Sequence, residues 1–247
     1  MVVQENKTES HIVVSDGVYA RYGKRAQDFC LALCALLVLW PLLLLLALVG
    51  AVAMKGNPFF LQKRPGLVDD STGRERVFTL IKFRTMTCDR DADGKLLPDD
   101  RRVTPYGKFL RDTSLDELPE LLNILVGDMA VVGPRPQLVR DMVFMTAEQR
   151  LRHRVRPGLT GLAQVSGPRA LLWENKLAID LQYIQKVTFA EDWRIIWRTA
   201  KVVFGRTNGC AEASVVWEDY GDHLLRVGAI DAAGYAARQA EAQNYDG

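Results

Sequence analysis

Two adjacent carboxylates, Asp116 and Glu117, stand in the stretch of this 247-residue chain that is best equipped for chemistry. Arg111 lies just upstream, and leucines recur downstream at helical spacing. Ser114 followed by Glu117 has the pattern of a capping box, which predicts that a helix begins here, although Pro119 favours a slightly later start. Such a pair could hold a divalent cation, attack a phosphorus atom, or only cap the helix. On spacing alone, capping is the commoner explanation.

The composition limits the class of protein. The formal net charge is +2, which gives no reason to expect nucleic-acid binding. The four cysteines form no Cys-x-x-Cys motif and the three histidines are scattered, so neither a disulfide framework nor a zinc site is expected. The length permits one large domain or two small ones.

An uncharged run from Phe29 to Met54 dominates the early chain. It is about 26 residues long against the roughly 20 that cross a bilayer, so a membrane helix is expected. Pro41 stands at its centre and removes one helical amide. A kinked spanning helix and a re-entrant helix that returns to the cytoplasmic face are both compatible with this pattern. Basic residues flank both ends, which the positive-inside rule places in the cytoplasm; they are Lys24, Arg25, Lys55, Lys63 and Arg64.

The remaining chain has the pattern of a mostly helical domain with a small sheet. Residues 59–62 and 77–81 have strand composition, and the turn-rich segment between them predicts a β-hairpin. Residues 176–187 and 189–204 have helical periodicity. The second segment carries Phe189, Trp193 and Trp197 on one face, which fits a helix at a membrane interface or a helix facing a core. Residues 206–247 are alanine-rich and polar, with no recognisable chemistry.

Two further groups of basic residues are notable. Arg135 lies between Pro134 and Pro136, which would hold its guanidinium rigidly for a phosphate group, unless it is an exposed turn arginine. A second group could contact anionic lipid head groups or lie on a solvated helix face. It consists of Arg150, Arg152, His153, Arg154 and Arg156.

The ordered set of motifs resembles the bacterial sugar transferase family. The length is similar to the small form of that family, the monotopic phosphoglycosyl transferases, such as the enzyme that starts N-linked glycan assembly in Campylobacter. The resemblance extends from about Lys24 to Phe204. Its motifs are Gln62 to Gly66, Lys82 to Met86, Ser114 to Pro119, Gly127 to Met129, Val132 to Pro136 and Arg156 to Gly161.

This resemblance implies a fold and an organisation. We expect an α+β fold, mainly α, with a re-entrant membrane helix hairpin broken at Pro41. A cytoplasmic globular domain of short helices, with a small β-hairpin and interfacial amphipathic helices, would follow. The expected divisions are a cytoplasmic arm (1–23), the re-entrant helix (24–55), the catalytic domain (56–205) and a C-terminal extension (206–247). The protein would lie at the cytoplasmic face of a bacterial inner membrane.

The resemblance also implies a reaction. A UDP-sugar would give its phosphosugar to polyprenol (undecaprenyl) phosphate and release UMP, as the first membrane step of glycoconjugate assembly, for an O-antigen, capsule, exopolysaccharide or glycoprotein glycan. In the family, the residue matching Asp116 forms a covalent phosphosugar intermediate, and Mg²⁺ is required near it. The residue matching Glu117 either assists proton transfer or positions the site. The expected phosphate-binding residues are Arg111, Arg135, Lys82 and Arg84.

Two other functions remain open at this point. One is a Mg²⁺-dependent membrane hydrolase of polyprenyl diphosphates or nucleotide sugars, and the other is a non-catalytic membrane scaffold whose acidic pair only caps a helix. The expected partners are a UDP-sugar, polyprenol phosphate and membrane lipids, without nucleic acid, and a homodimer is left open. The sequence does not identify the sugar, the glycan pathway or the role of the 206–247 extension.

Overall fold

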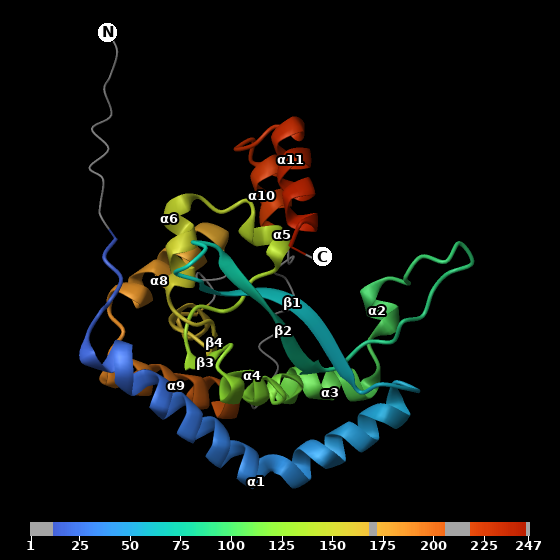
Figure 1. The fold of residues 1–247 in the computed structure, drawn as a ribbon. Coiled ribbons are helices and arrows are strands. Elements are labelled where there is room, and N and C mark those ends of the chain that lie inside the picture. The colour runs from blue at the N-terminus through green and yellow to red at the C-terminus, as the bar shows by residue number, and fades with distance from the viewer. Residues whose placement is uncertain (1–11, 168–171, 206–217, 246–247) are drawn as a thin grey trace.

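The structure, a computed structural model, describes residues 12–167, 172–205 and 218–245, and is mainly helical with two small sheets (Figure 1). This is the expected α+β class. Helix α1 (Lys24–Ala53) lies along one side of the molecule, drawn at the bottom of Figure 1. The predicted hairpin is confirmed as the antiparallel strands β1 (Phe59–Val68) and β2 (Glu75–Phe83). A buried core forms between α1, the hairpin and α4 (Glu120–Val126), from Ala32, Phe78, Leu80, Leu121, Ile124 and Met129.

Helix α1 is the one helix in the described part of the chain that is long and apolar enough to cross a membrane. Large apolar side chains along it, including Leu37, Val38 and Leu48, are exposed. The helix continues through Pro41 and bends near its middle (Figure 1). Such a bend is expected where a proline removes an amide and its ring crowds the preceding turn.

The first turn of α1 is bound to the globular domain. Nζ of Lys24 lies 2.5 Å from Oδ2 of Asp192, in helix α9 (Phe189–Gly205). Arg25 donates hydrogen bonds of 2.6 and 2.8 Å to the carbonyls of Ile124 and Leu125 at the end of α4, where a cation complements the helix dipole. These two basic residues, expected as membrane flanks, therefore also hold α1 to the domain.

The other end of α1 and the segment before it contact the same domain. The hydroxyl of Tyr106, in helix α3 (Pro105–Thr113), donates to the carbonyl of Leu46 at 2.7 Å. Before α1, the amide of Ser15 donates to the carbonyl of Ile184 at 2.8 Å. Both ends of α1 thus lie against one globular body, and its bend points away from that body (Figure 1).

The predicted capping box at Ser114 and Glu117 is wrong. Ser114 ends α3 instead, in the left-handed conformation with φ of 56°, and its side chain makes no capping hydrogen bond to the next turn. That conformation costs about 1–2 kcal/mol for a residue with a side chain. A 3-10 turn, Leu115–Glu117, follows, and α4 begins only at Glu120. The acidic pair is therefore presented on a tight turn between two helices.

The second half of the domain is built on a short parallel sheet, β3 (Ala130–Val132) with β4 (Gly158–Thr160). The predicted helices at 176–187 and 189–204 are confirmed as α8 (Trp173–Gln185) and α9. The aromatic face of α9 does not face a core, because Phe189, Trp193 and Trp197 are exposed. The remaining short helices are α2 (Asp99–Arg102), α5 (Val139–Met142), α6 (Ala147–Arg150) and α7 (Leu162–Val165).

Neither expectation for the basic cluster at 150–156 is correct, because four of its five members bind inside the fold. Arg152 is buried and pairs with Asp180 at 2.6 Å. Arg150 and His153 both contact the buried carboxylate of Glu75. Arg156 donates to the carbonyl of Gly127, and Arg154 alone is exposed.

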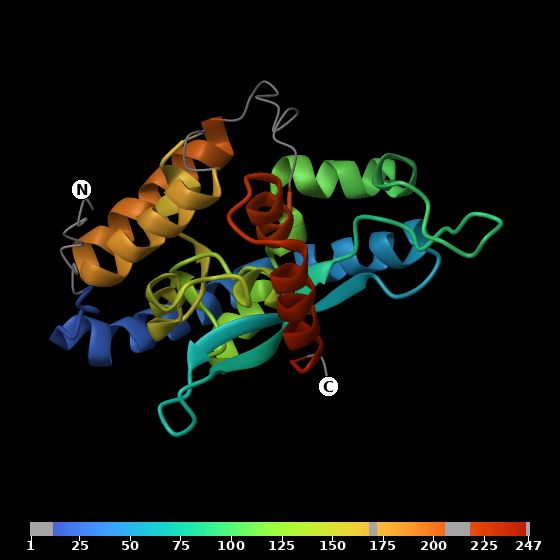
Figure 2. The same cartoon turned by 90° about the horizontal axis from the view of Figure 1, so that it is seen from above.

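The described part of the C-terminal extension is folded. It forms α10 (Tyr220–Arg226) and α11 (Ala232–Gln243), which lie over the β1–β2 hairpin on the side away from α1 (Figure 2). Tyr220 and Ala242 are buried in a core shared with α5. Residues 206–217 of the extension, and residues 1–11 of the predicted arm, lie outside the described residues.

We predict that Gly107→Ala destabilises the protein by about 3 kcal/mol, through overpacking. Helix α3 approaches the end of β2 so closely that a Cβ at Gly107 would lie 1.8 Å from the carbonyl oxygen of Thr85. Gly205→Ala is the matched control, because nothing lies within 4 Å of a Cβ there. Thermal unfolding in detergent compares the two variants, and equal Tm values would show that this approach does not constrain α3.

Candidate active site

Glu117 is held between two cations that come from distant segments. Its Oε1 lies 2.5 Å from Nη2 of Arg135, in the loop after β3, and 2.8 Å from Nζ of Lys82, in β2. Lys82 also lies 3.1 Å from Oε1 of Glu120, the first residue of α4. Three separate segments therefore meet at one charged cluster.

The charges of this cluster shift its pKa values in opposite directions. Burial alone would raise the pKa of Glu117, but Arg135 and Lys82 overcome that effect and lower it, so Glu117 is ionised. Burial raises the pKa of Glu120, and the neighbouring Glu117 charge raises it further. The pKa of Arg135 is raised, chiefly by Glu117, so its guanidinium stays charged.

Asp116 has a different environment from its neighbour. It is half-buried, and none of the ion pairs among the described residues includes it. Burial raises its pKa, and the Glu117 charge raises it further, while Lys82 and Arg135 act in the opposite direction. Asp116 therefore presents a carboxylate of increased basicity that is not occupied by a protein cation.

Two buried polar residues fix the position of the cluster. Asn123, in α4, accepts a 3.1 Å hydrogen bond from the amide of Ile81 and donates one of 2.8 Å to the carbonyl of Thr79, which ties α4 to β2. Arg152 donates a 2.6 Å hydrogen bond to the carbonyl of Arg135 and is itself paired with Asp180. The acidic turn and the Arg135 loop are thus held from outside the cluster.

Two clefts meet at Asp116. The first, of about 600 Å³, lies between the Arg135–Asp141 stretch, α8 and residues 218–219. The second, of about 560 Å³, runs along the start of β1 and the end of β2. Both volumes are in the range of small-ligand sites. The residues that line both are Arg64, Lys82, Arg111 and Asp116.

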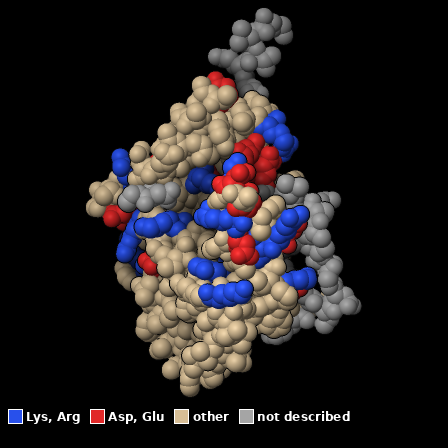
Figure 3. Space-filling view, turned by 90° about the vertical axis from the view of Figure 1, so that its right-hand side faces the viewer, with Lys and Arg blue, Asp and Glu red and all other residues tan. Residues whose placement is uncertain are grey.

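The structure places all six predicted site residues around these clefts. Arg111 lines both, and its Nε donates to Oγ1 of Thr85 at 3.0 Å. Glu117 and Arg135 line the first cleft, and Arg84 lines the second. On the face of the molecule shown in Figure 3, Lys and Arg gather around acidic groups above an uncharged lower surface. The arginine and lysine side chains thus concentrate positive charge where phosphate groups could bind.

Sequence reasoning missed several residues of this site. Glu120 directly follows the Ser114–Pro119 motif and has the pattern of an ordinary helix residue. Arg64 lies in the Gln62–Gly66 motif but was expected only as a membrane flank. Lys176 lines the first cleft, and burial lowers its pKa to about 8. The pairing of Arg152 with Asp180 gives no local signal, because 28 positions separate the two residues.

The donor set is compatible with Mg²⁺, although it is small. No group of three or more His, Cys, Asp or Glu side chains suited to a metal ion occurs in the described ranges. Glu117 is already paired with two cations, which leaves Asp116 as the available carboxylate. Mg²⁺ commonly binds through one or two carboxylates together with substrate phosphates and water, so Asp116 and a bound diphosphate would suffice.

Comparison with known proteins shows similarity over most of the chain. Residues 19–206 match the family described as bacterial sugar transferase. The sugar transferase EpsL of Bacillus subtilis is 44% identical over 162 residues, which is 65% of this chain and 77% of that protein. A UDP-glucose:undecaprenyl-phosphate glucose-1-phosphate transferase of Xanthomonas campestris is 38% identical over 199 residues, 76% of this chain but only 40% of the longer protein. The exopolysaccharide production protein PSS of Rhizobium leguminosarum is 36% identical over 197 residues, 75% of this chain and 97% of that protein.

We predict that Asp180→Asn lowers the free energy of unfolding by about 3–5 kcal/mol, because it leaves the Arg152 guanidinium buried without a counter-charge. Chemical denaturation in detergent measures the change. Asp222→Asn is the control, since Asp222 lies on the exposed side of α10 and accepts a hydrogen bond from the hydroxyl of Tyr235. An Asp180→Asn variant as stable as this control would contradict the assigned role of the pair.

Proposed function

The chain belongs to the bacterial sugar transferase family, and we propose that it transfers a phosphosugar from a UDP-sugar to polyprenol (undecaprenyl) phosphate and releases UMP. Several relatives, including the Xanthomonas campestris protein, are named as transferases of glucose 1-phosphate to undecaprenyl phosphate. The observation that carries the proposal is the position of Asp116, an unpaired carboxylate at the junction of two clefts that are rich in cations.

The two clefts suit two different substrates. The first is lined largely by charged and polar side chains, which suits a nucleotide sugar. The second includes Phe59, Phe60, Leu61 and Met86 and begins a few residues after the apolar helix α1, while Arg84 and Arg102 supply positive charge. A cleft that combines apolar side chains with positive charge suits a polyprenol phosphate. The carboxylate of Asp116, which lines both clefts, would then contact both substrates.

The proposed reaction has two displacements. A carboxylate oxygen of Asp116 attacks the β-phosphorus of the UDP-sugar, the bond from that phosphorus to the bridging oxygen breaks, and UMP leaves with the electron pair. A phosphate oxygen of the polyprenol phosphate then attacks the phosphorus of the aspartyl phosphosugar. The bond to Asp116 breaks, which forms the polyprenyl diphosphosugar and restores the carboxylate. Covalent catalysis divides one difficult displacement into two easier ones.

Positive charge is the main requirement of both steps, since in each an anionic oxygen attacks a phosphorus atom that carries negatively charged oxygens. Arg111 and Lys82 line both clefts and can neutralise phosphate oxygens in either step, whereas Arg135 serves the first cleft. Mg²⁺, bound by Asp116 and the diphosphate, would add Lewis-acid neutralisation and stabilise the leaving group.

Glu117 has a positioning role in this proposal. Its carboxylate is engaged by both Lys82 and Arg135, and its lowered pKa makes it a poor proton carrier near neutral pH. It orients the two cations that face the phosphate groups. Glu120, whose pKa is raised, is the carboxyl group of the cluster better able to hold a proton.

We further propose that α1 is re-entrant and that the protein lies at the cytoplasmic face of the inner membrane. Three contacts support this topology: Ser15 with Ile184 before α1, Lys24 with Asp192 at its start, and Tyr106 with Leu46 near its end. A helix that crossed the bilayer could not keep both ends against one soluble body. The exposed apolar bend of α1 and the exposed aromatic face of α9 would then enter the lipid and its interface.

We predict that the wild-type protein, given a UDP-sugar labelled in the sugar and Mg²⁺ but no lipid acceptor, gains the mass of one phosphosugar and releases UMP, because Asp116 carries the intermediate. Intact-mass spectrometry measures the adduct, and Asp116→Asn should show none. Asp112→Asn, an exposed carboxylate paired with Lys108, is the matched control and should form the adduct.

Adding polyprenol phosphate should move the label from the protein to the lipid. If the label appears in a water-soluble phosphosugar instead, the protein is a hydrolase. If no UMP is released under any condition, the protein is a non-catalytic scaffold. Near-normal turnover by Asp116→Asn would exclude Asp116 as the nucleophile.

We predict that cysteines at positions 16 and 71 are both protected from an impermeant thiol reagent in intact spheroplasts and both labelled after lysis. The variants Asp16→Cys and Ser71→Cys replace exposed residues before and after α1, in a background without Cys30, Cys34, Cys88 and Cys210. Because both segments belong to one globular body, they should lie on the cytoplasmic side. Labelling of Asp16→Cys before lysis would establish a spanning helix.

A further inference from the structure

The C-terminal segment reaches the first cleft although it lies outside the family match, which ends at residue 206. Glu218 and Asp219, just before α10, form part of the cleft wall together with Arg140, Trp173 and Lys176. The cleft therefore has two components. Asp116, Glu117 and Arg135 lie inside the family region, and one wall comes from a segment beyond it.

Several contacts hold this segment firmly in place. Tyr220 is buried, and its amide donates a 2.9 Å hydrogen bond to Oδ1 of the buried Asp141, in α5. Gly221 lies so close to Phe144 that a Cβ would stand 2.5 Å from its ring. The hydroxyl of Tyr220 also exchanges hydrogen bonds with Gln149. These are contacts of a folded wall, which has a defined position relative to Arg135.

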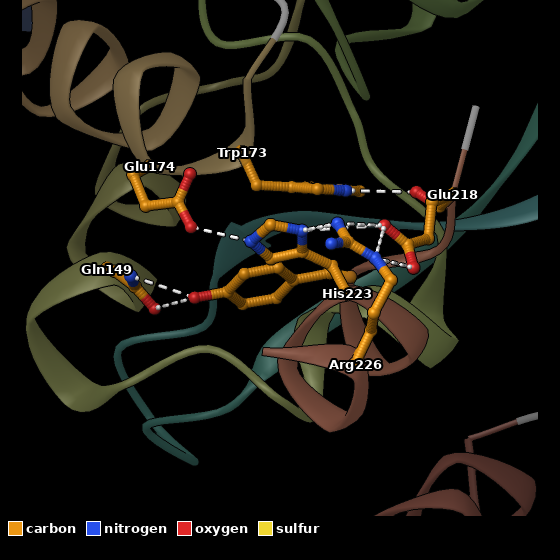
Figure 4. A network of polar contacts seen from close by, with 7 residues as sticks. Gln149, Trp173, Glu174, Glu218, His223 and Arg226 are labelled. Carbon is orange, nitrogen blue, oxygen red and sulfur yellow. Dashed lines mark hydrogen bonds and ion pairs between the residues drawn. The ribbon is translucent and has the colours of Figure 1, made fainter. Parts of the chain in front are cut away.

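A polar network joins the same segment to the start of α8 (Figure 4). The indole of Trp173 donates to the carbonyl of Glu218 at 2.9 Å. His223 lies 2.6 Å from the carboxylate of Glu174, and Arg226 donates to the carboxylate of Glu218 at 2.8 Å. Since the carboxylate of Glu218 is occupied by Arg226, Asp219 supplies the carboxylate of this wall that faces Arg140.

Asp219 changes what the cleft can recognise. Its Oδ1 lies 2.9 Å from Nη2 of Arg140, a cleft arginine with a half-exposed side chain. An unpaired arginine there would attract another phosphate group. The pair instead offers N–H donors and carboxylate acceptors side by side in the cleft, and this combination suits a ring with hydroxyl groups.

We propose that Asp219, with Arg140, is a specificity-determining residue that binds the hydroxyl groups of the donor's polyhydroxylated ring in the first cleft. This inference rests on the proposed transfer from a UDP-sugar. Two rings of that donor have the required chemistry, the hexose and the ribose. The segment that contains Asp219 would then select among donors while Asp116 performs the reaction.

The test is a comparison of Asp219→Asn with wild type in the full-length, membrane-embedded protein. The amide removes the charge while keeping the shape, so the KM for the donor should rise about tenfold, as expected for the loss of a hydrogen bond to a charged group. The kcat and the KM for polyprenol phosphate should stay within about twofold, because neither reports on this contact. Asp222→Asn, on the exposed side of α10, should leave every constant unchanged.

Two measurements identify the ring. If the ratio of kcat/KM between UDP-glucose and UDP-galactose changes in Asp219→Asn while inhibition by UMP does not, Asp219 binds the hexose. If inhibition by UMP weakens tenfold and that ratio stays constant, it binds the ribose. Either outcome supports the inference.

The inference is overturned if Asp219→Asn behaves like Asp222→Asn, or if it lowers kcat for all donors together with the Tm, which would indicate a structural role only. Failure of the proposed function would be distinct, because the wild type itself would then form no lipid-linked product with any UDP-sugar. In that case, calorimetric binding of UDP-glucose by wild type and Asp219→Asn still tests the contact without turnover.

Discussion

The partly buried carboxylate of Glu117 is the constraint on which the site depends. A charge that is largely removed from water is unfavourable unless it is paired, and Glu117 is paired with both Lys82 from β2 and Arg135 from the loop after β3. The pairing of Glu117 brings three distant segments together and fixes the side chains of Lys82 and Arg135 at the cleft. Asp116, one residue earlier on the same tight turn, is thereby placed among these cations without being paired to them. The two adjacent carboxylates have different environments because only Glu117 is paired with these two cations.

The attachment of α1 follows similar physical rules. Its polar first turn is fixed by ion pairing of Lys24 with Asp192 and by Arg25 at the carboxyl end of α4, while its long apolar surface remains uncovered. Because α4 begins three residues after Glu117, the helix that Arg25 caps is also the helix that carries Glu120 into the charged cluster. The apolar helix α1 and the charged site therefore both contact one short helix. This arrangement suits a reaction between a soluble nucleotide sugar and a lipid phosphate.

Local sequence patterns predicted the hairpin, α8 and α9, because turn composition and periodicity are local properties. The six candidate site residues were named from the order of the motifs, and all six lie around the two clefts. The capping box at Ser114 failed because a left-handed backbone there gives the segment a different path. The cluster at 150–156 was misjudged because its counter-charges, Glu75 and Asp180, lie far away in the sequence. A run of arginines looks exposed until its partners are known. The contribution of the predicted C-terminal extension to the cleft was not foreseen for the same reason, since its polar, alanine-rich pattern does not reveal that Tyr220 is buried against Asp141.

The stretch from Arg135 to Asp141 connects these features. Arg152 holds its beginning by the carbonyl of Arg135, and the amide of Tyr220 holds its end through Asp141. The first contact lies within the family region and the second comes from beyond it. A change in the C-terminal segment can therefore alter the outer wall of the cleft without moving Asp116, because Glu117 and Arg152 fix the inner end independently. In the proposed reaction, such a division would let one set of residues perform a fixed phosphoryl chemistry while another set adapts to the group that is transferred.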